Sequence, residues 1–349
     1  MTTIVIDCRF AGTGTGLSRY TTELVEALLA CAPPSFHYIL LVRSESVMQN
    51  VSLPHRSIVV DIPHYSLAEQ TTLPSILRSS GADLAFFPHF NAPFFCPLPY
   101  VATVHDLILH RYPGSASMLK QAAYRILVHR TLRRALAIIA VSQWTKNDIA
   151  TIYGPTIMKK TTVVGEGVSD CYVRQDAERI DVVRRKYGLQ KPFFLYIGNC
   201  KPHKNVPLLL QAFTDAHLTD ELIIVTSEAE ARLLSLPRGA RVLHGVPNDD
   251  LPALYSAAKC FVTASLEEGY CLPIAEALAC GCPVIATNRS AIPEVLNGHG
   301  QLLEPTVEAF AAAFLNPPTL PGPISVGQWS DAAVQTTALF ERVTQKRSR

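Results

Sequence analysis

Strand-like apolar runs alternate with helical runs along this 349-residue chain, and this alternation constrains the fold more than any other feature. In the first half the strand-like runs lie at 3–7, 37–42, 57–61, 83–87, 101–104 and 137–141. After Gly165-Glu166-Gly167-Val168 the pattern restarts, with runs at 193–197, 222–226, 242–243, 260–264 and 283–286. Strands that alternate with helices form mostly parallel, doubly wound sheets. We therefore expect two α/β domains, residues 1–167 and 168–325.

The composition permits two large cores and argues against several classes of protein. Hydrophobic residues make up 48% of the chain and charged residues 17%, and the length exceeds that of one typical domain. The net charge of +2, without a Lys/Arg tract, excludes nucleic acid as an expected partner. No run approaches the roughly 20 apolar residues of a membrane span, and no signal peptide is recognisable, so we expect a cytoplasmic protein.

Nine scattered cysteines predict reduced, mostly buried thiols, because none of them forms a CxxC pair. A metal site at Cys280 and Cys282 would need a partnering Cys or His pair, and no such pair lies nearby in the sequence. We therefore expect no metal ion.

Two carboxylates, Glu268 and Glu276, lie eight positions apart in the segment LEEGYCLPIAEALACGCPVI, residues 266–285. Pro273 opens a run of helix formers over 274–280, and Gly281 ends it, so Glu268 is predicted in the loop and Glu276 in the first turn. The strand-like run 282–287 follows, which makes the loop part of an α/β unit. Open α/β sheets bind ligands at the carboxyl ends of their strands, and the free N–H groups of the helix start favour an anion. By spacing alone, two solvated acids on an ordinary helix remain an alternative.

The surrounding residues resemble the EGFGLP(x)xEAxAxGxPV element of the retaining, GT-B-fold glycosyltransferases of family 4. The resemblance implies that Glu268 contacts the transferred hexose and that Glu276 binds the ribose of the nucleotide. It also implies that the backbone of Tyr270, Cys271 and Leu272 holds the hexose and the diphosphate. Cys271 stands where the family has a small glycine, so we expect a crowded sugar pocket.

A glycine-rich segment at residues 12–16 precedes a helix that begins near Ser18. Glycines there let backbone amides approach a phosphate. A dinucleotide site would also need an acid at the end of the second strand, and none is present. The segment resembles the GGxG loop and following RY pair of family 4, which assigns Gly14 and Gly16 to the donor diphosphate and Arg19 and Tyr20 to the acceptor. A glycine-rich turn without a ligand is the alternative.

The pair His105-Asp106 directly follows the strand-like run 101–104, with His89 and Asn91 upstream. The pair resembles the HD pair of family 4, whose histidine contacts the reacting sugar. We expect His105 to be catalytic, as a neutral imidazole that stabilises an oxocarbenium-like transition state. His89 and Asn91 are expected on the acceptor side. For each of the two histidines, a purely structural role is the alternative.

The loop 198–205 resembles the G(R/T)xxPRKN element of family 4, and its lysine corresponds to Lys204. A cation near the leaving diphosphate offsets the charge that develops as the glycosidic bond breaks. Lys204 is therefore expected to be catalytic, with Asn199 and His203 as further donor-binding residues at positions where the family has arginines. The turn around Val246 resembles the family element that reads the nucleobase through its backbone.

These resemblances imply a GT-B enzyme of two Rossmann-like domains, with a C-terminal helix in segment 326–349 crossing back to the first domain. Ser330 is predicted to cap that helix, over 331–345. We expect a retaining hexosyltransferase of bacterial polysaccharide (lipopolysaccharide) assembly, without a cofactor, that uses a nucleoside diphosphate sugar. GDP-mannose is the first expectation for the donor and a glycan or lipid-linked molecule for the acceptor. An inactive sugar-nucleotide-binding protein and a dinucleotide oxidoreductase are the alternatives.

The helical segment 120–146 carries six Lys and Arg residues among interleaved apolar residues. Such a basic amphipathic face can hold a peripheral enzyme on the inner, anionic face of the cytoplasmic membrane. An ordinary solvated helix face is the equal alternative.

Overall fold

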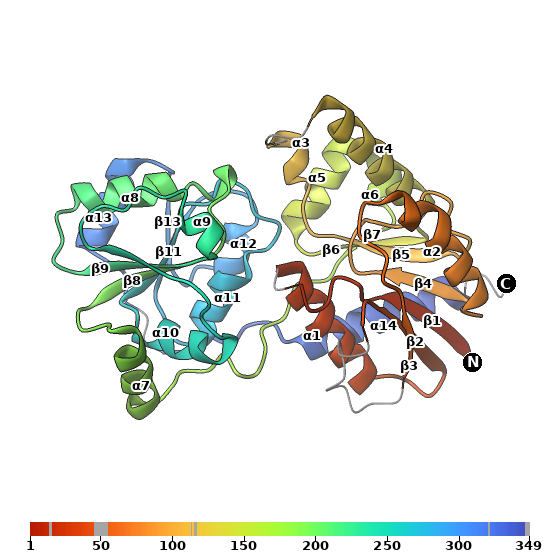
Figure 1. The fold of residues 1–349 in the computed structure, drawn as a ribbon, viewed down its shortest axis with the longest axis horizontal. Coiled ribbons are helices and arrows are strands. Elements are labelled where there is room, and N and C mark those ends of the chain that lie inside the picture. The colour runs from red at the N-terminus through yellow and green to blue at the C-terminus, as the bar shows by residue number, and fades with distance from the viewer. Residues whose placement is uncertain (14–15, 45–54, 113, 115–116, 320–321, 346–349) are drawn as a thin grey trace. The chain divides into compact units, whose positions relative to one another are not determined.

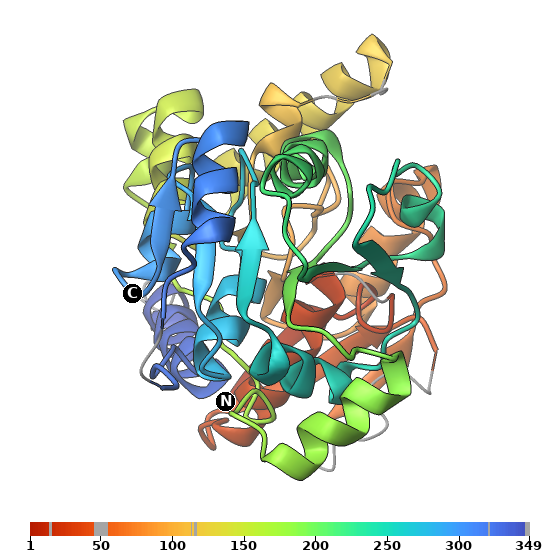
Figure 2. The same cartoon turned by 90° about the vertical axis from the view of Figure 1, so that its left-hand side faces the viewer.

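The computed structural model describes all residues except 14–15, 45–54, 113, 115–116, 320–321 and 346–349. The chain divides into two compact units, each with its own core. The first unit consists of Met1–Gly167 together with Gly327–Arg349, and the second unit consists of Val168–Val326. In each unit, helices cover both faces of a parallel sheet (Figures 1 and 2). No helix among the described residues is long and apolar enough to cross a membrane.

The described part of the first unit forms a seven-stranded sheet with the order β3-β2-β1-β4-β5-β6-β7, and its paired strands run parallel. The strands are β1 (Thr2–Asp7), β2 (Phe36–Val42), β3 (Arg56–Val59), β4 (Leu84–Phe87), β5 (Tyr100–Val104), β6 (Ala137–Ala140) and β7 (Thr161–Val163). The helices are α1 (Gly16–Ala30), α2 (Leu67–Ser79), α3 (Ile108–Arg111), α4 (Met118–Arg134), α5 (Gln143–Tyr153), α6 (Pro155–Met158) and α14 (Trp329–Gln345).

The described part of the second unit forms a six-stranded parallel sheet with the order β10-β9-β8-β11-β12-β13. The strands are β8 (Phe193–Ile197), β9 (Glu221–Val225), β10 (Ala240–Leu243), β11 (Cys260–Thr263), β12 (Val284–Thr287) and β13 (Gln301–Leu303). The helices are α7 (Ala177–Tyr187), α8 (Val206–Asp215), α9 (Glu228–Ala231), α10 (Leu251–Ala257), α11 (Leu272–Ala279), α12 (Ile292–Leu296) and α13 (Val307–Leu315), with single 3-10 turns η1 (Pro202–Lys204) and η2 (Asn248–Asp250).

The strand order places a switch point in each sheet. In the first unit the chain builds outward from β1 to β2 and β3, and then continues on the other side of β1 with β4. The second sheet does the same between β8 and β11. Loops that leave neighbouring strands in opposite directions open a crevice at the carboxyl ends of the strands, and α/β proteins bind ligands there. The expected doubly wound architecture is confirmed.

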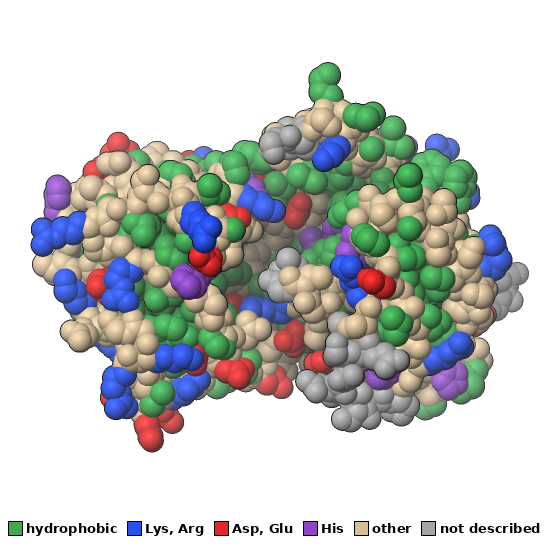
Figure 3. Space-filling model, viewed as in Figure 1, with side chains coloured by type: hydrophobic (Ala, Val, Ile, Leu, Met, Phe, Trp, Pro, Cys, Tyr) green, Lys and Arg blue, Asp and Glu red, His purple; other side chains and the backbone are tan. Residues whose placement is uncertain are grey.

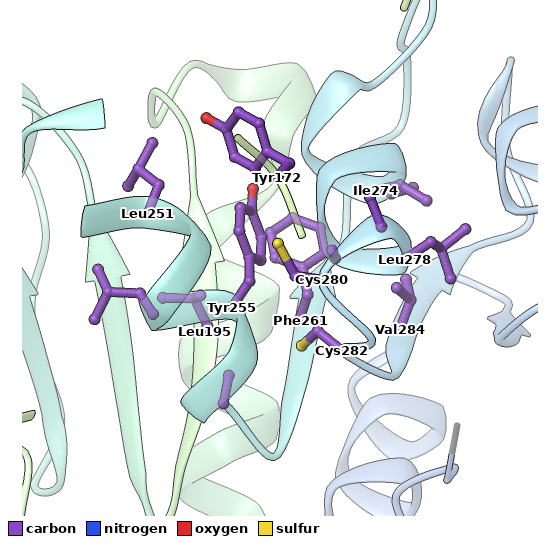
Figure 4. Packing of buried hydrophobic residues seen from close by; sticks show 14 of the residues in the cluster. Tyr172, Leu195, Leu251, Tyr255, Phe261, Ile274, Leu278, Cys280, Cys282 and Val284 are labelled. Carbon is purple, nitrogen blue, oxygen red and sulfur yellow. The ribbon is translucent and has the colours of Figure 1, made fainter. Parts of the chain in front are cut away.

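The strands are buried on both faces because helices pack against each side. In β8, Phe193 and Leu195 enter one hydrophobic core, while Phe194 and Tyr196 enter the core on the opposite face. Full burial of one such side chain stabilises a fold by about 1.5–3 kcal/mol. Figure 4 shows the first of these cores, which also includes the aromatic ring of Tyr255.

The last helix, α14, belongs to the first unit although it follows the second unit in the chain, which confirms the expected crossing back. It packs along α1, and its Phe340 meets Phe86 of β4 with ring centroids 5.2 Å apart. The helix begins at Trp329, one residue before the Ser330 cap that the sequence predicts. The carboxylate of Asp331 accepts a hydrogen bond from the Gln328 N–H at 3.3 Å, so an acid inside the first turn satisfies the helix start instead.

Candidate functional site

In the second unit, Lys204 and Glu268 meet at the switch point. Lys204 ends the turn η1 after β8, and Glu268 lies in the loop between β11 and α11. The Lys204 Nζ lies 2.6 Å from Oε1 and 2.7 Å from Oε2 of Glu268. The two loops are tied together, because the Leu266 N–H donates to the His203 carbonyl at 2.7 Å. The sequence-predicted pair is therefore brought together as one mostly buried ion pair.

His203 lies beside this pair and is mostly buried. Burial lowers the pKa of its imidazole to about 4, and the Lys204 charge acts in the same direction. The imidazole is therefore neutral at pH 7. A neutral ring adds no positive charge where the family has an arginine, so the positive charge of this loop comes from Lys201 and Lys204.

Cys271 adopts a left-handed backbone conformation, with φ of 83°, directly before α11. Only glycine takes this conformation without a steric cost, which is on the order of 1–2 kcal/mol for other residues. The side chain packs in the hydrophobic core, and burial, followed by the Glu268 charge, raises the pKa of the thiol well above its usual value. The backbone at this position thus has a conformation that favours glycine, although cysteine occupies it. The expected crowding of the sugar pocket stays a prediction.

Glu276 is not in the first turn of its helix, so this prediction is wrong. The helix α11 begins at Leu272, two residues before the predicted run, and Glu276 falls in the second turn. Glu276 is 2% exposed, and its Oε2 accepts a hydrogen bond from the Tyr255 hydroxyl at 2.9 Å. Tyr255, on α10, was missed by the sequence reasoning, and it fixes the orientation of this carboxylate.

The remaining residues predicted to bind the donor lie in loops of the second unit. The Asn199 carbonyl accepts from the Tyr196 hydroxyl at 2.5 Å, so Asn199 closes the loop after β8. Val246 is half-buried in the loop between β10 and η2, and Tyr270 is half-buried against the core. Leu272 is the first residue of α11. Their contacts with a nucleotide stay predictions.

In the first unit, both nitrogens of the His105 ring face acceptors. Nδ1 lies 3.1 Å from Oε1 of Glu166, and Nε2 lies 2.8 Å from the Pro88 carbonyl oxygen. Burial alone would lower the pKa of His105, but the hydrogen bond and charge of Glu166 raise it above its usual value. The geometry favours the doubly protonated cation over the expected neutral imidazole, because a ring between two acceptors is stabilised when both of its nitrogens carry hydrogen.

Glu166 was missed as a site residue, although the sequence placed it in the glycine-flanked junction after the last strand of the first domain. Its neighbour Gly167 shows why that junction needs glycine. A Cβ at Gly167 would lie 2.2 Å from the Trp329 backbone nitrogen. The close approach of α14 therefore fixes the backbone that presents Glu166 to His105.

Tyr20 lies against His105 rather than on an open surface. The two rings meet edge to face with centroids 4.4 Å apart, and the Tyr20 hydroxyl lies 3.2 Å from Oγ1 of Thr103. Tyr20 is 1% exposed, and the acceptor contact expected for it stays a prediction. Arg19 is half-buried on α1 and Gly16 is the exposed first residue of that helix, whereas Gly14 lies outside the described residues.

A buried charged network at the carboxyl end of β1 holds Asn91 and was not predicted. Arg9 is fully buried and donates to Asp7 at 2.8 and 2.7 Å and to Glu69 at 2.8 Å. The Asn91 amide donates to the same Glu69 oxygen at 2.7 Å. The buried Oδ1 of Asn91 has no hydrogen-bond partner, and the buried Nδ1 of His89 has none either. The Asn91 oxygen can accept a hydrogen bond from a ligand, and the His89 nitrogen can donate or accept one, depending on the tautomer.

The nine cysteines are free thiols, and Cys280 and Cys282 are both buried. Burial raises the pKa of Cys282 well above its usual value, and it raises that of Cys280 as well. Within the described residues, no group of three His, Cys, Asp or Glu side chains could hold a metal ion.

Comparison with known proteins matches both halves of the chain. Residues 14–170 match the family described as Glycosyltransferase Family 4, and residues 191–316 match Glycosyl transferases group 1. The O-antigen chain mannosyltransferase B of Escherichia coli is 31% identical over 62% of this chain, and the match spans 60% of that protein. The O-antigen chain mannosyltransferase RfbU of Salmonella typhimurium is 25% identical, with 91% of each chain covered.

Solved structures agree on the fold. Anabaena HepE, solved in complex with UDP and glucose, superposes with a TM-score of 0.73 at 17% identity, with 100% of both chains covered. At this identity the likeness establishes the fold alone. With two matched family segments that together cover most of the chain and a GT-B architecture, the chain belongs to the GT-B glycosyltransferases of family 4.

Proposed function

We propose that this glycosyltransferase moves a hexose from a nucleoside diphosphate sugar to a glycan or lipid-linked acceptor, with retention of the α configuration. The ion pair of Lys204 and Glu268 at the switch point of the second sheet carries this proposal. It supplies a cation for a leaving diphosphate and a carboxylate for sugar hydroxyls in one place. The family assignment sets aside the oxidoreductase alternative.

The ion pair has a direct consequence for how a donor binds. In the structure Lys204 is held by both oxygens of Glu268. A diphosphate offers the same cation more negative charge, so we propose that it replaces Glu268 as the partner of Lys204. The released carboxylate then accepts hydrogen bonds from the hexose. Lys204 then keeps an anionic partner and the carboxylate keeps hydrogen-bond donors, so neither buried group is left without a partner.

For the chemical step, we propose front-face displacement within an ion pair. The C–O bond to the diphosphate breaks first, Lys204 stabilises the charge on the leaving oxygen, and the acceptor hydroxyl attacks from the same face. A diphosphate oxygen takes the proton of that hydroxyl, so no protein nucleophile and no metal ion is required. Stabilisation of this kind acts on the transition state and is worth about 3–4 kcal/mol for a single group.

We propose that Glu276 binds the ribose hydroxyls. A carboxylate held by Tyr255 presents its remaining lone pairs in a fixed direction, which suits a vicinal diol. On the first unit, His105 is proposed as a hydrogen-bond donor to the hexose, exchanging the Pro88 carbonyl for a sugar hydroxyl. As a cation paired with Glu166 it brings no net charge to a developing oxocarbenium ion.

GDP-mannose is proposed as the donor, because the relatives from Escherichia coli and Salmonella typhimurium described above are named mannosyltransferases. For the same reason bacterial polysaccharide assembly is the proposed setting, with the enzyme in the cytoplasm at the inner face of the membrane. An inactive nucleotide-sugar-binding protein is the second candidate, because Cys271 imposes a strained backbone next to the proposed sugar site.

A panel of GDP- and UDP-sugars tests the proposal by donor hydrolysis, transfer and calorimetric binding. We expect Lys204→Ala to lower kcat by about 100-fold or more. The matched control is Lys259→Ala, which breaks an ion pair of 2.8 Å with Asp220 on the surface of the same unit and should leave kcat unchanged. Binding without turnover across the panel would favour the inactive candidate, and no binding of any nucleotide sugar would refute both.

A further inference from the structure

Aromatic rings gather at the switch point of the first sheet, where α/β proteins bind ligands. Phe10 follows β1 and His89 follows β4, whereas His64 and Tyr65 lie in the segment that joins β3 to α2. The Phe10 and His64 rings are stacked, with centroids 3.5 Å apart and planes 9° apart. The His89 ring centroid lies 5.2 Å from that of Phe10 and 6.4 Å from that of Tyr65. We call these four residues the aromatic cluster.

Tyr65 is held at the surface by a constrained backbone. It is 62% exposed, and its φ of 59° is a left-handed conformation that favours glycine and is strained for a large side chain. Its N–H donates to Oε2 of Glu69 at 2.8 Å, and Glu69 is itself fixed by Arg9 and Asn91. Figure 3 shows histidine side chains beside hydrophobic ones at the surface of the first unit. An exposed ring on a strained backbone points to a function.

The aromatic cluster also holds ring nitrogens that are not satisfied. Within the described part of the chain, Nε2 of His64 and Nδ1 of His89 are buried and have no hydrogen-bond partner. Nδ1 of His64 lies 3.6 Å from Oε1 of Glu69, which is longer than a hydrogen bond. Leaving such atoms without a partner destabilises a fold, and a ligand hydroxyl relieves the cost because it can donate as well as accept.

The charges beside the aromatic cluster disfavour an anionic ligand. Arg9 is fully buried and is already paired with two carboxylates, those of Asp7 and Glu69, so this network carries more negative than positive charge. Burial lowers the pKa of His89 well below its usual value, so this ring is neutral at pH 7. A phosphate would meet a surplus of carboxylate charge here, whereas uncharged hydroxyl groups would not.

A sugar ring has the complementary chemistry. The C–H groups of a pyranose form an apolar face that packs on an aromatic ring, and the hydroxyl groups around its edge form hydrogen bonds with polar atoms. Tyr65 provides an accessible ring. His89 links it to His105, because the His89 and His105 ring centroids are 6.2 Å apart. The step from Tyr65 to His89 and the step from His89 to His105 are each comparable with the length of one sugar residue in a glycan.

We propose that the aromatic cluster is a subsite for an uncharged sugar residue of the acceptor, with the sugar packed on Tyr65 and its hydroxyl groups bound by His64 and His89, which are both partly exposed. The sugar that receives the hexose then lies nearer His105, and the subsite holds the sugar next to it. The first unit therefore recognises a neutral glycan end and not a phosphate. The inference rests on the proposed function for the role of this sugar as acceptor, but the binding itself requires no donor and no turnover.

Saturation-transfer NMR of the full chain without donor tests the subsite. The probes are the methyl glycosides of mannose, glucose, galactose and N-acetylglucosamine, together with mannose 6-phosphate and glucose 6-phosphate. We expect at least one uncharged glycoside to bind and the 6-phosphate of the same sugar to bind more weakly. Tyr65→Gly should weaken binding about fivefold, because it removes the aromatic contact. Glycine suits the left-handed backbone, so this variant should fold. Tyr65→Phe keeps the ring and should bind like the unaltered protein.

The matched control is Phe95→Ala, which removes another exposed aromatic ring, 71% exposed, from the same unit and should leave sugar binding unchanged. An equal loss in Phe95→Ala and Tyr65→Gly would overturn the subsite in favour of unspecific contact with aromatic rings. Absence of binding by every glycoside would overturn it as well, and equal or tighter binding of the 6-phosphates would overturn the selection of an uncharged sugar. Nucleotide-sugar binding and turnover are measured separately, so failure of the proposed function and failure of the subsite are distinguishable.

Discussion

The contact of His105 with Glu166 permits a sharp test, because substitution of Glu166 by glutamine keeps the size of the side chain and removes its charge. The Pro88 carbonyl can only accept, so Nε2 of His105 must carry a hydrogen. Nδ1 then donates to Glu166 only when the ring is charged. In Glu166→Gln the ring loses its negative partner, and we expect it to titrate at a lower pH.

The magnitude follows from the burial of the pair. The His105 and Glu166 side chains are 17% and 9% exposed, so solvent screens their interaction little. A hydrogen bond to a charged group contributes about 1.5–3 kcal/mol, and we expect the variant to lose about 2 kcal/mol of unfolding free energy. The folded-state pKa of His105 is raised above its unfolded value near 6.5. The stabilisation is therefore complete below that value and is lost as the pH rises through the folded pKa.

Denaturant unfolding at several pH values between about 5.5 and 9, combined with NMR titration of the His105 ring, measures both effects. The difference between the two proteins should be largest at acid pH and should shrink at alkaline pH. Glu228→Gln is the control, because Glu228 pairs with Arg232 at 63% and 75% exposure and should change little. If His105 kept its raised pKa in Glu166→Gln, the assignment of its charge to this carboxylate would be refuted.

Three further perturbations test other contacts. Tyr255→Phe removes the hydroxyl that holds Glu276 and should lower the unfolding free energy of the second unit by about 2 kcal/mol and weaken nucleotide binding in calorimetry. Gly167→Ala should cost about 3 kcal/mol or more in denaturant unfolding, since its Cβ would collide with the Trp329 backbone. At pH 8, Cys271 should be alkylated far more slowly than the exposed Cys171, because burial keeps the Cys271 thiol protonated. Mass spectrometry follows both reactions.

The strands could be predicted from sequence where their side chains are buried on both faces. The runs predicted for β1, β2, β4, β5 and β6 lie within two residues of the observed bounds, because continuous apolar runs are strong local signals. The strands β7 and β13 were not predicted. Each has three residues at the edge of its sheet and partly exposed side chains, so neither carries a recognisable pattern.

The site residues also fall into two groups, those that a local sequence pattern reveals and those that only the fold brings together. Lys204, Glu268 and Glu276 lie in short motifs, and a local pattern is enough to select them. Glu166 reaches His105 across 61 positions, which only the strand order of the sheet brings together. The start of α11 was misplaced for a different reason. A left-handed residue before the helix is expected to be glycine, and here the chain uses Cys271.

Each unit holds a mostly buried cation that is paired with carboxylates. The two cations differ in their exposure, and this difference indicates which of them a substrate can reach. Arg9 is neutralised by Asp7 and Glu69, and Lys204 is neutralised by Glu268, each at the carboxyl end of a central strand. Arg9 is 0% exposed, so an incoming anion cannot replace its partners without unfolding the network. Lys204 is 19% exposed and reaches its partner from a loop turn. This difference in exposure supports the proposal that a diphosphate exchanges with the carboxylate at Lys204, whereas the network around Arg9 has a structural role.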